Sequence, residues 1–246
     1  MKRLIYCLLI IFLLSCSNDK PEVVSKQYLY EKVFEDNYPV DFEIYLETIE
    51  NSKKISRLIE RLIYQNNNLD NYVLHIEDRF VKDAENTNVP FVLNNDGIEY
   101  YYKSYLYEDY YITYFDNSYV IFCFDTYYYY SGTAHGNFWT DFYFIDIAEE
   151  RLLEIDELIM PIPDNILRGI INNEYDTDGY SFLRENLWQP DAVNITDTGV
   201  ELIWNIYSIL PYFFGTIWIE VPEEISGQYL TPKGREIFSR IKESVP

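Results

Sequence analysis

The spacing of apolar residues predicts helices in several parts of the chain. After Ser52, which suits a helix N-cap, the i, i+3, i+4, i+7, i+8 pattern of one helix face is carried by Ile55, Leu58, Ile59, Leu62 and Ile63. A second helix is predicted from Asp70 to the Asn-rich segment 86–88, and a third begins at Asp164. Thr231-Pro232 joins an N-cap residue to a proline at the first helical position, which predicts a C-terminal helix within 231–246.

Other segments alternate apolar or aromatic residues with polar ones, as β-strands do. The predicted strands are 28–34, 98–107, 110–115, 119–130, 138–147, 152–155, 192–195, 200–205 and 214–221. Strands and helices do not alternate regularly, so the pattern predicts an α+β fold made of two small units of antiparallel sheet packed with helices. We expect an N-terminal domain over 27–127 and a C-terminal domain over 128–230.

The first residues have the features of an export signal. Met1-Lys2-Arg3 is followed by an apolar run over 4–14 and then by Ser15-Cys16. This run is shorter than the about 20 residues that cross a membrane as a helix. Leu13-Leu14-Ser15-Cys16 resembles the bacterial lipobox, which predicts a lipoprotein signal peptide over 1–15, an acylated Cys16 and a tether over 16–26. The alternative is an ordinary signal peptide in which Cys16 has no role.

Acidic residues outnumber basic ones by far. The chain of 246 residues has 41 Asp and Glu against 19 Lys and Arg, a formal net charge of −22. A surface of this charge repels phosphate backbones, which excludes nucleic acid as a partner. It attracts cationic proteins instead.

Cysteine chemistry contributes little to the function. Of the 3 Cys, Cys7 lies in the predicted signal peptide and Cys16 is the predicted lipid site, which leaves Cys123. No disulfide can then form within the mature chain. Cys123 lies in a strand-like apolar run, so we expect a buried and inert thiol.

Candidate metal and catalytic groups are few. The oxygen-bearing side chains of Glu174, Asp176, Asp178 and Glu185 occupy positions 1, 3, 5 and 12 of a possible calcium loop. Pro190 leaves little room for the helix that normally follows such a loop, so a solvated acidic loop is favoured over a calcium site. We expect no metal and no cofactor, and the sequence assigns no catalytic residue.

Tyrosine is unusually abundant, with 26 residues, and many of them are adjacent. Neighbouring residues on a strand point to opposite faces, so a run of tyrosines cannot enter one core entirely. Exposed tyrosines on a rigid sheet are typical of surfaces that bind proteins or carbohydrates. The candidate partner contacts are therefore Tyr127, Tyr128, Tyr129 and Tyr130. The alternative is that tyrosine simply fills strands.

One motif resembles a known family. Ser131, Gly132, Ala134, His135, Gly136 and Asn137 belong to a run, Ser-Gly-Thr-Ala-His-Gly-Asn, that is similar to a signature of a bacterial envelope domain of unknown function. That domain occurs in lysozyme-binding anti-sigma factors of the RsiV type and in peptidoglycan deacetylases of the PdaC type. Thr133 departs from the usual glycine. The segments Asp197-Thr198-Gly199 and Trp204-Asn205 are similar to the closing hairpin of the same family.

This resemblance implies a binding domain and does not transfer an activity. It gives a PdaC-like N-terminal region and an RsiV-like C-terminal region, with lysozyme as a possible partner. His135 either faces a ligand or uses its ring to fix the loop, and the second role is favoured because no general-base partner is nearby in sequence. We expect a lipid-anchored binding module of the bacterial cell envelope, facing the periplasm or the exterior. The alternative is an accessory protein of peptidoglycan or a weak glycan hydrolase.

Overall fold

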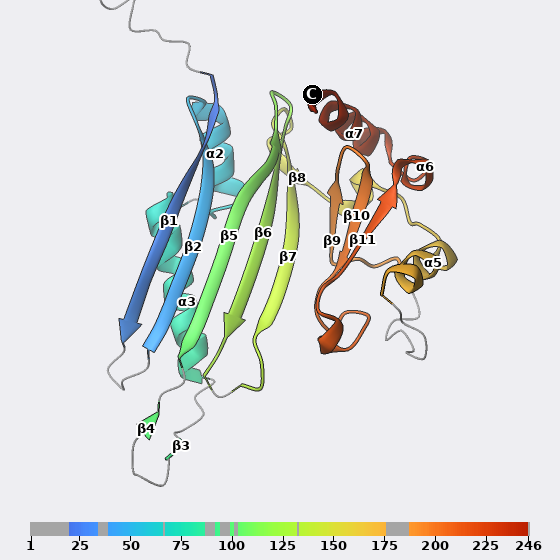
Figure 1. Ribbon diagram of the computed structural model, residues 1–246. Coiled ribbons are helices and arrows are strands. Elements are labelled where there is room, and N and C mark those ends of the chain that lie inside the picture. The colour runs from blue at the N-terminus through green and yellow to red at the C-terminus, as the bar shows by residue number, and fades with distance from the viewer. Residues whose placement is uncertain are drawn as a thin grey trace, which may run out of the picture.

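A six-stranded sheet runs through the centre of the molecule (Figure 1). The computed structural model describes residues 20–33, 39–65, 67–86, 92–93, 99–100, 103–131, 133–175 and 187–245. In spatial order the strands are β1 (Glu22–Val33), β2 (Pro39–Glu50), β5 (Ser104–Phe115), β6 (Tyr119–Tyr129), β7 (Asn137–Asp146) and β8 (Arg151–Leu153).

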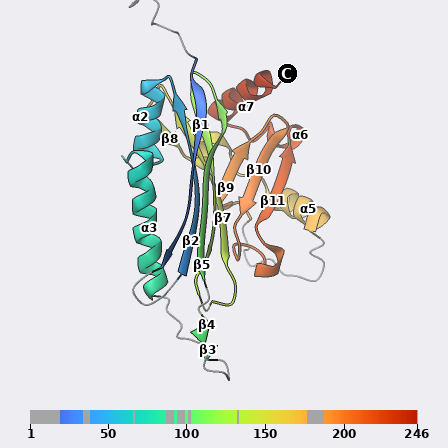
Figure 2. The ribbon, with the colours of Figure 1, turned by 60° about the vertical axis from the view of Figure 1, so that its left-hand side comes forward.

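The sheet is mixed, because β2 and β5 run parallel while their neighbours pair antiparallel. Parallel neighbours need a crossover connection, and the helices α2 (Lys53–Leu62) and α3 (Leu69–Asn86) belong to it. Both helices lie on one side of the sheet, as Figure 2 shows. The predicted α+β class is confirmed; the parallel pair departs from the wholly antiparallel pairing that was expected.

The core beneath α2 and α3 follows from the alternation along β2. Val40, Phe42, Ile44 and Leu46 are all buried on the face that meets the helices. They pack in one cluster with apolar residues of both helices, including Ile59, Ile76 and Phe80. This burial holds the helices against the sheet.

The C-terminal part forms a second unit around a three-stranded antiparallel sheet. Its strands lie in the order β11 (Ile217–Pro222), β10 (Gly199–Trp204) and β9 (Ala192–Ile195). They share a core with the side of β6 and β7 that faces away from α2 and α3. The remaining elements of this unit are α4 (Ile155–Leu158), α5 (Asp164–Tyr175), η1 (Tyr212–Phe214), α6 (Glu223–Ser226) and α7 (Pro232–Ser244). A small separate pair is formed by β3 (Val92–Leu93) and β4 (Glu99–Tyr100).

The large sheet continues past the expected domain boundary at residues 127 and 128. Both residues lie inside β6, which pairs with β7 from Tyr119 to Tyr128. At the upper end in Figure 1, α7 is fixed to this sheet by ion pairs of Arg240 with Asp116, at 2.9 Å, and of Lys233 with Asp146, at 2.8 Å.

Local signals in the sequence are matched by the backbone. The hydroxyl of Ser52 accepts the N–H of Ile55, and the hydroxyl of Thr231 accepts the N–H of Gly234, so both predicted N-caps are confirmed. The carboxylate of Asp116 accepts the N–H groups of Ser118 and Tyr119 at 2.6 and 2.8 Å, which fixes the tight turn between β5 and β6.

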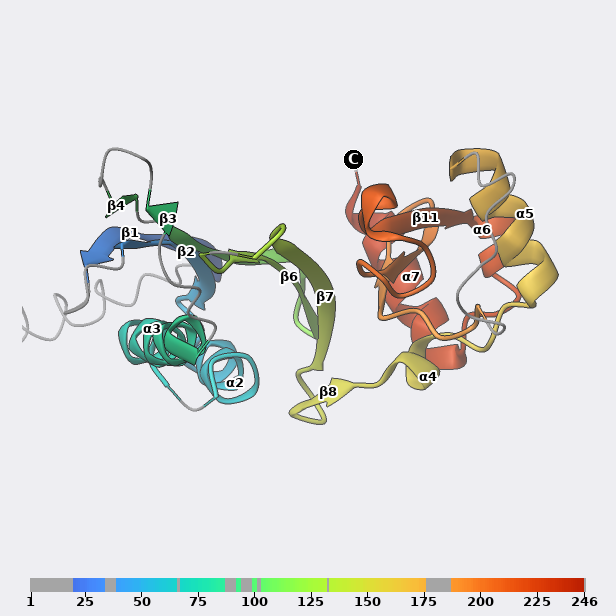
Figure 3. The same cartoon turned by 90° about the horizontal axis from the view of Figure 1, so that it is seen from below.

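Seen from below in Figure 3, the two faces of the large sheet differ. The helices α2 and α3 cover one face, and the C-terminal unit lies beyond β7. Among the described elements, no helix covers the opposite face of β1, β2 and β5. The side chains of that uncovered face form the candidate site.

Candidate functional site

The predicted motif loop joins β6 to β7 and contacts the C-terminal unit. Its His135 ring stacks on the ring of Tyr212, with 3.8 Å between the ring centroids. His135 Nε2 lies 2.9 Å from the Tyr207 hydroxyl, and Nδ1 lies 3.0 Å from the carbonyl oxygen of Gly136. Both ring nitrogens therefore have partners, which supports the structural role for this histidine.

Gly136 is needed because a ring approaches its backbone closely. A Cβ at this position would lie 2.3 Å from Cε2 of Tyr127, well inside contact distance. The backbone of Gly136 is also held, since its carbonyl oxygen accepts the Tyr212 hydroxyl at 3.0 Å. Close packing, rather than an unusual backbone angle, explains glycine here.

Two further residues of the motif loop, Ser131 and Thr133, form hydrogen bonds to other parts of the chain. The hydroxyl of Thr133 donates to the carbonyl oxygen of Tyr130 at 2.7 Å, and the N–H of Ser131 donates to the hydroxyl of Ser104 at 3.0 Å. Ala134 is exposed, and Asn137 begins β7 opposite Tyr128. Gly132 lies outside the described residues.

Asn205 connects the two units through the backbone of Thr140. Its Oδ1 accepts the Thr140 N–H at 2.8 Å, and its Nδ2 donates to the Thr140 carbonyl oxygen at 3.0 Å. The side chain thus imitates the pairing of a neighbouring strand at the free edge of β7. Asn205 is 1% exposed, so this junction excludes water.

The uncovered side of the sheet carries tyrosines and carboxylates in alternation. We call this surface the tyrosine–carboxylate face, formed by Glu43, Tyr45, Glu47, Tyr105, Tyr107, Asp109, Tyr111, Asp125 and Tyr127. These residues are half-buried. Among the described residues, no basic side chain forms an ion pair with its four carboxylates.

Hydrogen bonds fix each carboxylate of this face. Glu43 accepts the hydroxyls of Tyr45 and Tyr105, at 2.5 and 2.7 Å. Asp109 accepts the hydroxyl of Tyr107 at 3.1 Å. Glu47 links its strand to both neighbours, because its carboxylate accepts the N–H of Ile112 on β5 at 2.7 Å and the hydroxyl of Ser25 on β1 at 2.6 Å. The negative charges are therefore held by neutral donors, and no basic side chain in the described part of the chain neutralises them.

The pKa shifts on this face keep the phenols neutral and move the pKa values of Glu43 and Asp109 in opposite directions. Partial burial, followed by neighbouring carboxylates, raises the pKa of Tyr105 and Tyr107. Hydrogen bonds from Tyr45 and Tyr105 lower the pKa of Glu43. Burial raises the pKa of Asp109, and the charges of Asp125 and Glu47 add to this effect. At neutral pH the face presents negative charge and phenol donors.

A groove lies where this face meets the C-terminal unit. Its volume is about 470 Å³, and its walls are Tyr107, Asp125, Thr126, Tyr127, Phe138, Trp139, Thr140, Gly215 and Thr216. The ring of Tyr127 is the centre of an aromatic row, 5.8 Å from Tyr105 and 4.7 Å from Phe138. Phe138 and Trp139 are 45% and 44% exposed, which is unusual for such large apolar side chains.

The four tyrosines predicted as partner contacts are divided between the two faces. Tyr127 lies on the tyrosine–carboxylate face, and strand alternation places Tyr129 on the same side. Tyr128 and Tyr130 pack with the core under α3, where Tyr130 stacks on Phe80 at 5.0 Å. These two rings do not belong to the candidate surface.

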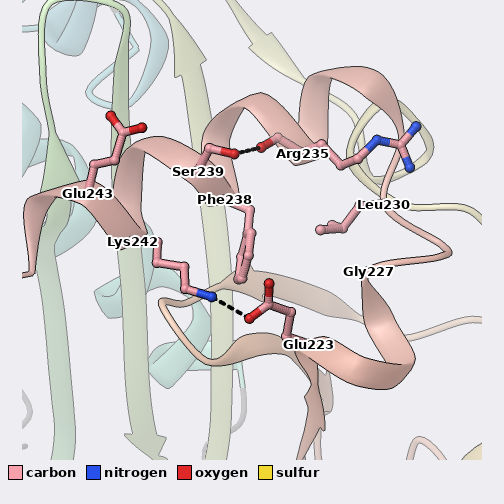
Figure 4. Close-up of a pocket in the computed structure, with 8 residues that line it drawn as sticks. All are labelled: Glu223, Gly227, Leu230, Arg235, Phe238, Ser239, Lys242 and Glu243. Carbon is pink, nitrogen blue, oxygen red and sulfur yellow. Dashed lines mark hydrogen bonds and ion pairs between the residues drawn. The ribbon is translucent and has the colours of Figure 1, made fainter.

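A second hollow lies between α6 and α7 and is less suited to binding. Figure 4 shows its lining, in which Lys242 and Glu223 form an ion pair at 2.5 Å across the opening. The hydroxyl of Ser239 is also occupied, because it donates to the carbonyl oxygen of Arg235 at 2.9 Å. The charged groups that line the opening are in part already paired with one another.

Several predicted residues fall outside the described part of the chain. These are Cys16 and, in the possible calcium loop, Asp176, Asp178 and Glu185; Glu174 lies in α5. Within the described residues, no cluster of three or more His, Cys, Asp or Glu side chains could hold a metal ion. Likewise, no described helix is long and apolar enough to span a membrane. Cys123 is a buried free thiol whose pKa is raised by burial, as expected for an inert cysteine.

The sequence prediction missed residues that complete the site. Glu43, Tyr45 and Glu47 lie on β2, which was not predicted as a strand, although the apolar residues from Val40 to Leu46 alternate. Tyr207, with a φ of 63°, and Asn205 contact the motif loop or β7 from more than 60 residues away in sequence. Only Asn205 carried a signal, as part of the family-like hairpin.

The comparisons with known proteins concern the fold. No family model matches the chain, and no curated protein does either. A solved DUF3298 family member from Bacteroides fragilis NCTC 9343 is similar with a TM-score of 0.67 at 15% identity, over 92% of this chain and 99% of that chain. A DUF3298 family protein from Pseudomonas aeruginosa PAO1 gives a TM-score of 0.52 at 15% identity, over 88% and 97%. The chain therefore shares its fold with two bacterial DUF3298 proteins.

Proposed function

We propose that the chain is a lipid-anchored binding module of the bacterial cell envelope whose tyrosine–carboxylate face binds a cationic protein. The observation that carries the proposal is the set of four carboxylates on that face. Neutral hydrogen-bond donors hold these carboxylates in place, and no described basic residue forms an ion pair with them. A basic partner supplies the missing positive charge, and the tyrosine rings supply contact area at low entropy cost.

A basic muramidase such as a c-type lysozyme fits this surface. The net charge of −22 favours encounter with a strongly basic protein. The resemblance of the motif loop to domains of the RsiV and PdaC types points to the same partner. The motif loop contacts the C-terminal unit through His135 and Gly136, so we expect the partner to bind the face beside the loop.

The lipid anchor is proposed from the sequence at Cys16. In Figure 1, β1 begins at the upper end of the molecule, whereas β6 ends and β7 begins toward the lower end, where the groove-lining residues Tyr127 and Phe138 belong to these strands. A lipid on Cys16 then presents the groove away from the membrane. Metabolic labelling with an alkyne fatty acid should mark the wild-type chain and spare Cys16→Ala. Equal labelling of both chains would contradict the anchor.

Calorimetric titration at low salt tests the binding function. The chain from Ser17 onward, which contains every described element, is titrated with c-type lysozyme and with other basic muramidases. We expect saturable heat with at least one of them. Absence of heat with all of them would remove the cationic-protein proposal.

A glycan is the second candidate, and the groove is the observation that favours it. Aromatic rings at the mouth of a groove with a carboxylate in its wall are also suited to stacking on sugar rings. Titration with soluble peptidoglycan fragments in the same buffer separates the two candidates. Heat with the fragments and none with the basic proteins would make this protein a glycan-binding accessory.

A further inference from the structure

The groove beside β7 combines an anionic group with aromatic walls. Asp125 lies in its wall, and its carboxylate accepts the hydroxyls of Thr140 and Tyr111 at 2.6 and 3.3 Å. A carboxylate offers about four lone-pair positions, so Asp125 retains acceptor capacity after these two bonds. No described cation pairs with it.

The walls favour a flat cation. Tyr107, Tyr127 and Phe138 line the groove, and the face of an aromatic ring attracts positive charge. The Tyr127 ring packs beside Phe138 at 4.7 Å and against Gly136, so its position is fixed before binding. A guanidinium is planar, weakly hydrated and able to donate two parallel hydrogen bonds to one carboxylate, whereas an ammonium is a strongly hydrated point charge.

The negative charge around the groove also favours a cationic ligand. Asp109 on β5 is the cross-strand partner of Asp125 on β6. The carboxylate of Asp125 therefore lies in the groove wall, and that of Asp109 lies next to the groove. A neutral ligand leaves this repulsion in place, while a cation relieves it.

We propose that the groove is a specific subsite for an arginine side chain of the partner, with the guanidinium against Asp125 and stacked on the aromatic wall. This inference rests on the proposed function and names the chemistry that recognises the partner. It assigns to Asp125, Tyr107 and Tyr127 the role of binding residues.

Three short peptides provide the test. The amides of Gly-Arg-Gly, Gly-Lys-Gly and Gly-citrulline-Gly differ in charge and in hydrogen-bonding shape at one side chain. Trp139 lines the groove and reports binding through its fluorescence, and the Trp139→Phe variant shows which part of the signal is local. We expect saturable binding of the arginine peptide, about fivefold weaker binding of the lysine peptide and no binding of the citrulline peptide. Equal binding of all three, or of arginine and lysine, overturns the proposal.

A pair of matched variants locates the site. Asp125→Asn should weaken binding of the arginine peptide about tenfold. Asp156→Asn makes the same change of charge in another hollow, beside Trp188, and should leave the affinity unchanged. Equal affinities of Asp125→Asn and wild type, with melting temperatures that show both to be folded, contradict the subsite. Binding of peptidoglycan fragments that the arginine peptide does not displace contradicts it as well.

Lysozyme binding by Asp125→Asn and by the wild type distinguishes the arginine subsite from the proposed function. If Asp125→Asn binds lysozyme as tightly as the wild type does, the arginine subsite is wrong and the acidic face retains its function. If no basic protein binds the wild type, the proposed function itself is wrong, whatever the peptides do.

Discussion

Glu108 has an unusual position for a carboxylate. It lies on the helix-facing side of β5, is 1% exposed, and is contacted by Arg79 of α3 at 3.2 Å through one oxygen. The other oxygen has no hydrogen-bond partner among the described residues. Burial raises the pKa of Glu108 to about 7, and the charge of Arg79 opposes part of this rise.

This raised pKa predicts that the stability of the protein depends on pH. The folded protein holds the proton of Glu108 more tightly than the unfolded chain, in which the pKa is near 4.5. The contribution to stability is therefore full below about pH 4.5 and is lost as the pH rises to about 7, by roughly 2–3 kcal/mol. Urea unfolding of wild type and Glu108→Gln between pH 5 and pH 7.5 measures it. The variant should lack this slope, and parallel curves for the two chains would exclude the effect.

Gly136 gives a second prediction at the scale of one residue. Gly136→Val places side-chain atoms against the Tyr127 ring, so we expect a loss of roughly 1–3 kcal/mol and a melting temperature lower by several degrees. Gly169→Ala in α5 is the control, because nothing lies within 4 Å of its Cβ. That control should melt no lower than the wild type. Unchanged melting of Gly136→Val would show that the loop is not packed as described.

At the scale of elements, Asn205 makes a buried polar contact between the two units. Asn205→Ala leaves the N–H and the carbonyl oxygen of Thr140 without partners in a buried junction. We expect a loss of about 2–4 kcal/mol in the free energy of unfolding. Asn117→Ala, in the exposed turn between β5 and β6, should change it by less than about 0.5 kcal/mol. Similar values for both variants would contradict the role given to Asn205.

The elements also show what sequence patterns can predict. Local signals were sufficient for α2 and α7, because caps and periodicity act within a few residues. The parallel pairing of β2 with β5 could not be predicted, since it depends on where the crossover helices pack. The segments 98–107 and 110–115 were predicted as separate strands, while in the structure β5 runs from Ser104 to Phe115 and spans parts of both, with an irregular register between Ile112 and Tyr114. The first segment also contains β4.

The candidate site was predictable only in outline. Alternation correctly implied that a run of tyrosines divides between two faces, and the family-like motif indicated an important loop. The contacts of His135 with Tyr207 and Tyr212 depend on tertiary packing across about 70 residues, which no local pattern contains. The carboxylates of β2 were missed together with their strand.

At the scale of the whole molecule, charge should control the rate of association. A net charge of −22 creates a long-range potential that speeds encounter with a basic protein and is screened by salt. We expect the association rate with c-type lysozyme to fall about tenfold between low and physiological salt, while the dissociation rate changes little. Surface plasmon resonance at several salt concentrations measures both rates. A salt effect confined to dissociation would contradict electrostatic steering.

One comparison of dissociation constants tests most directly whether the tyrosine–carboxylate face is the binding surface. The double variant Glu43→Gln, Asp109→Asn removes two charges from the face. The control variant Glu224→Gln, Glu243→Gln removes two charges from α6 and α7, so both variants have the same net charge. In calorimetric titrations with c-type lysozyme at low salt, the face variant should bind about tenfold more weakly than the wild type, and the control less than about twofold more weakly. Equal affinities of the two variants would contradict the claim.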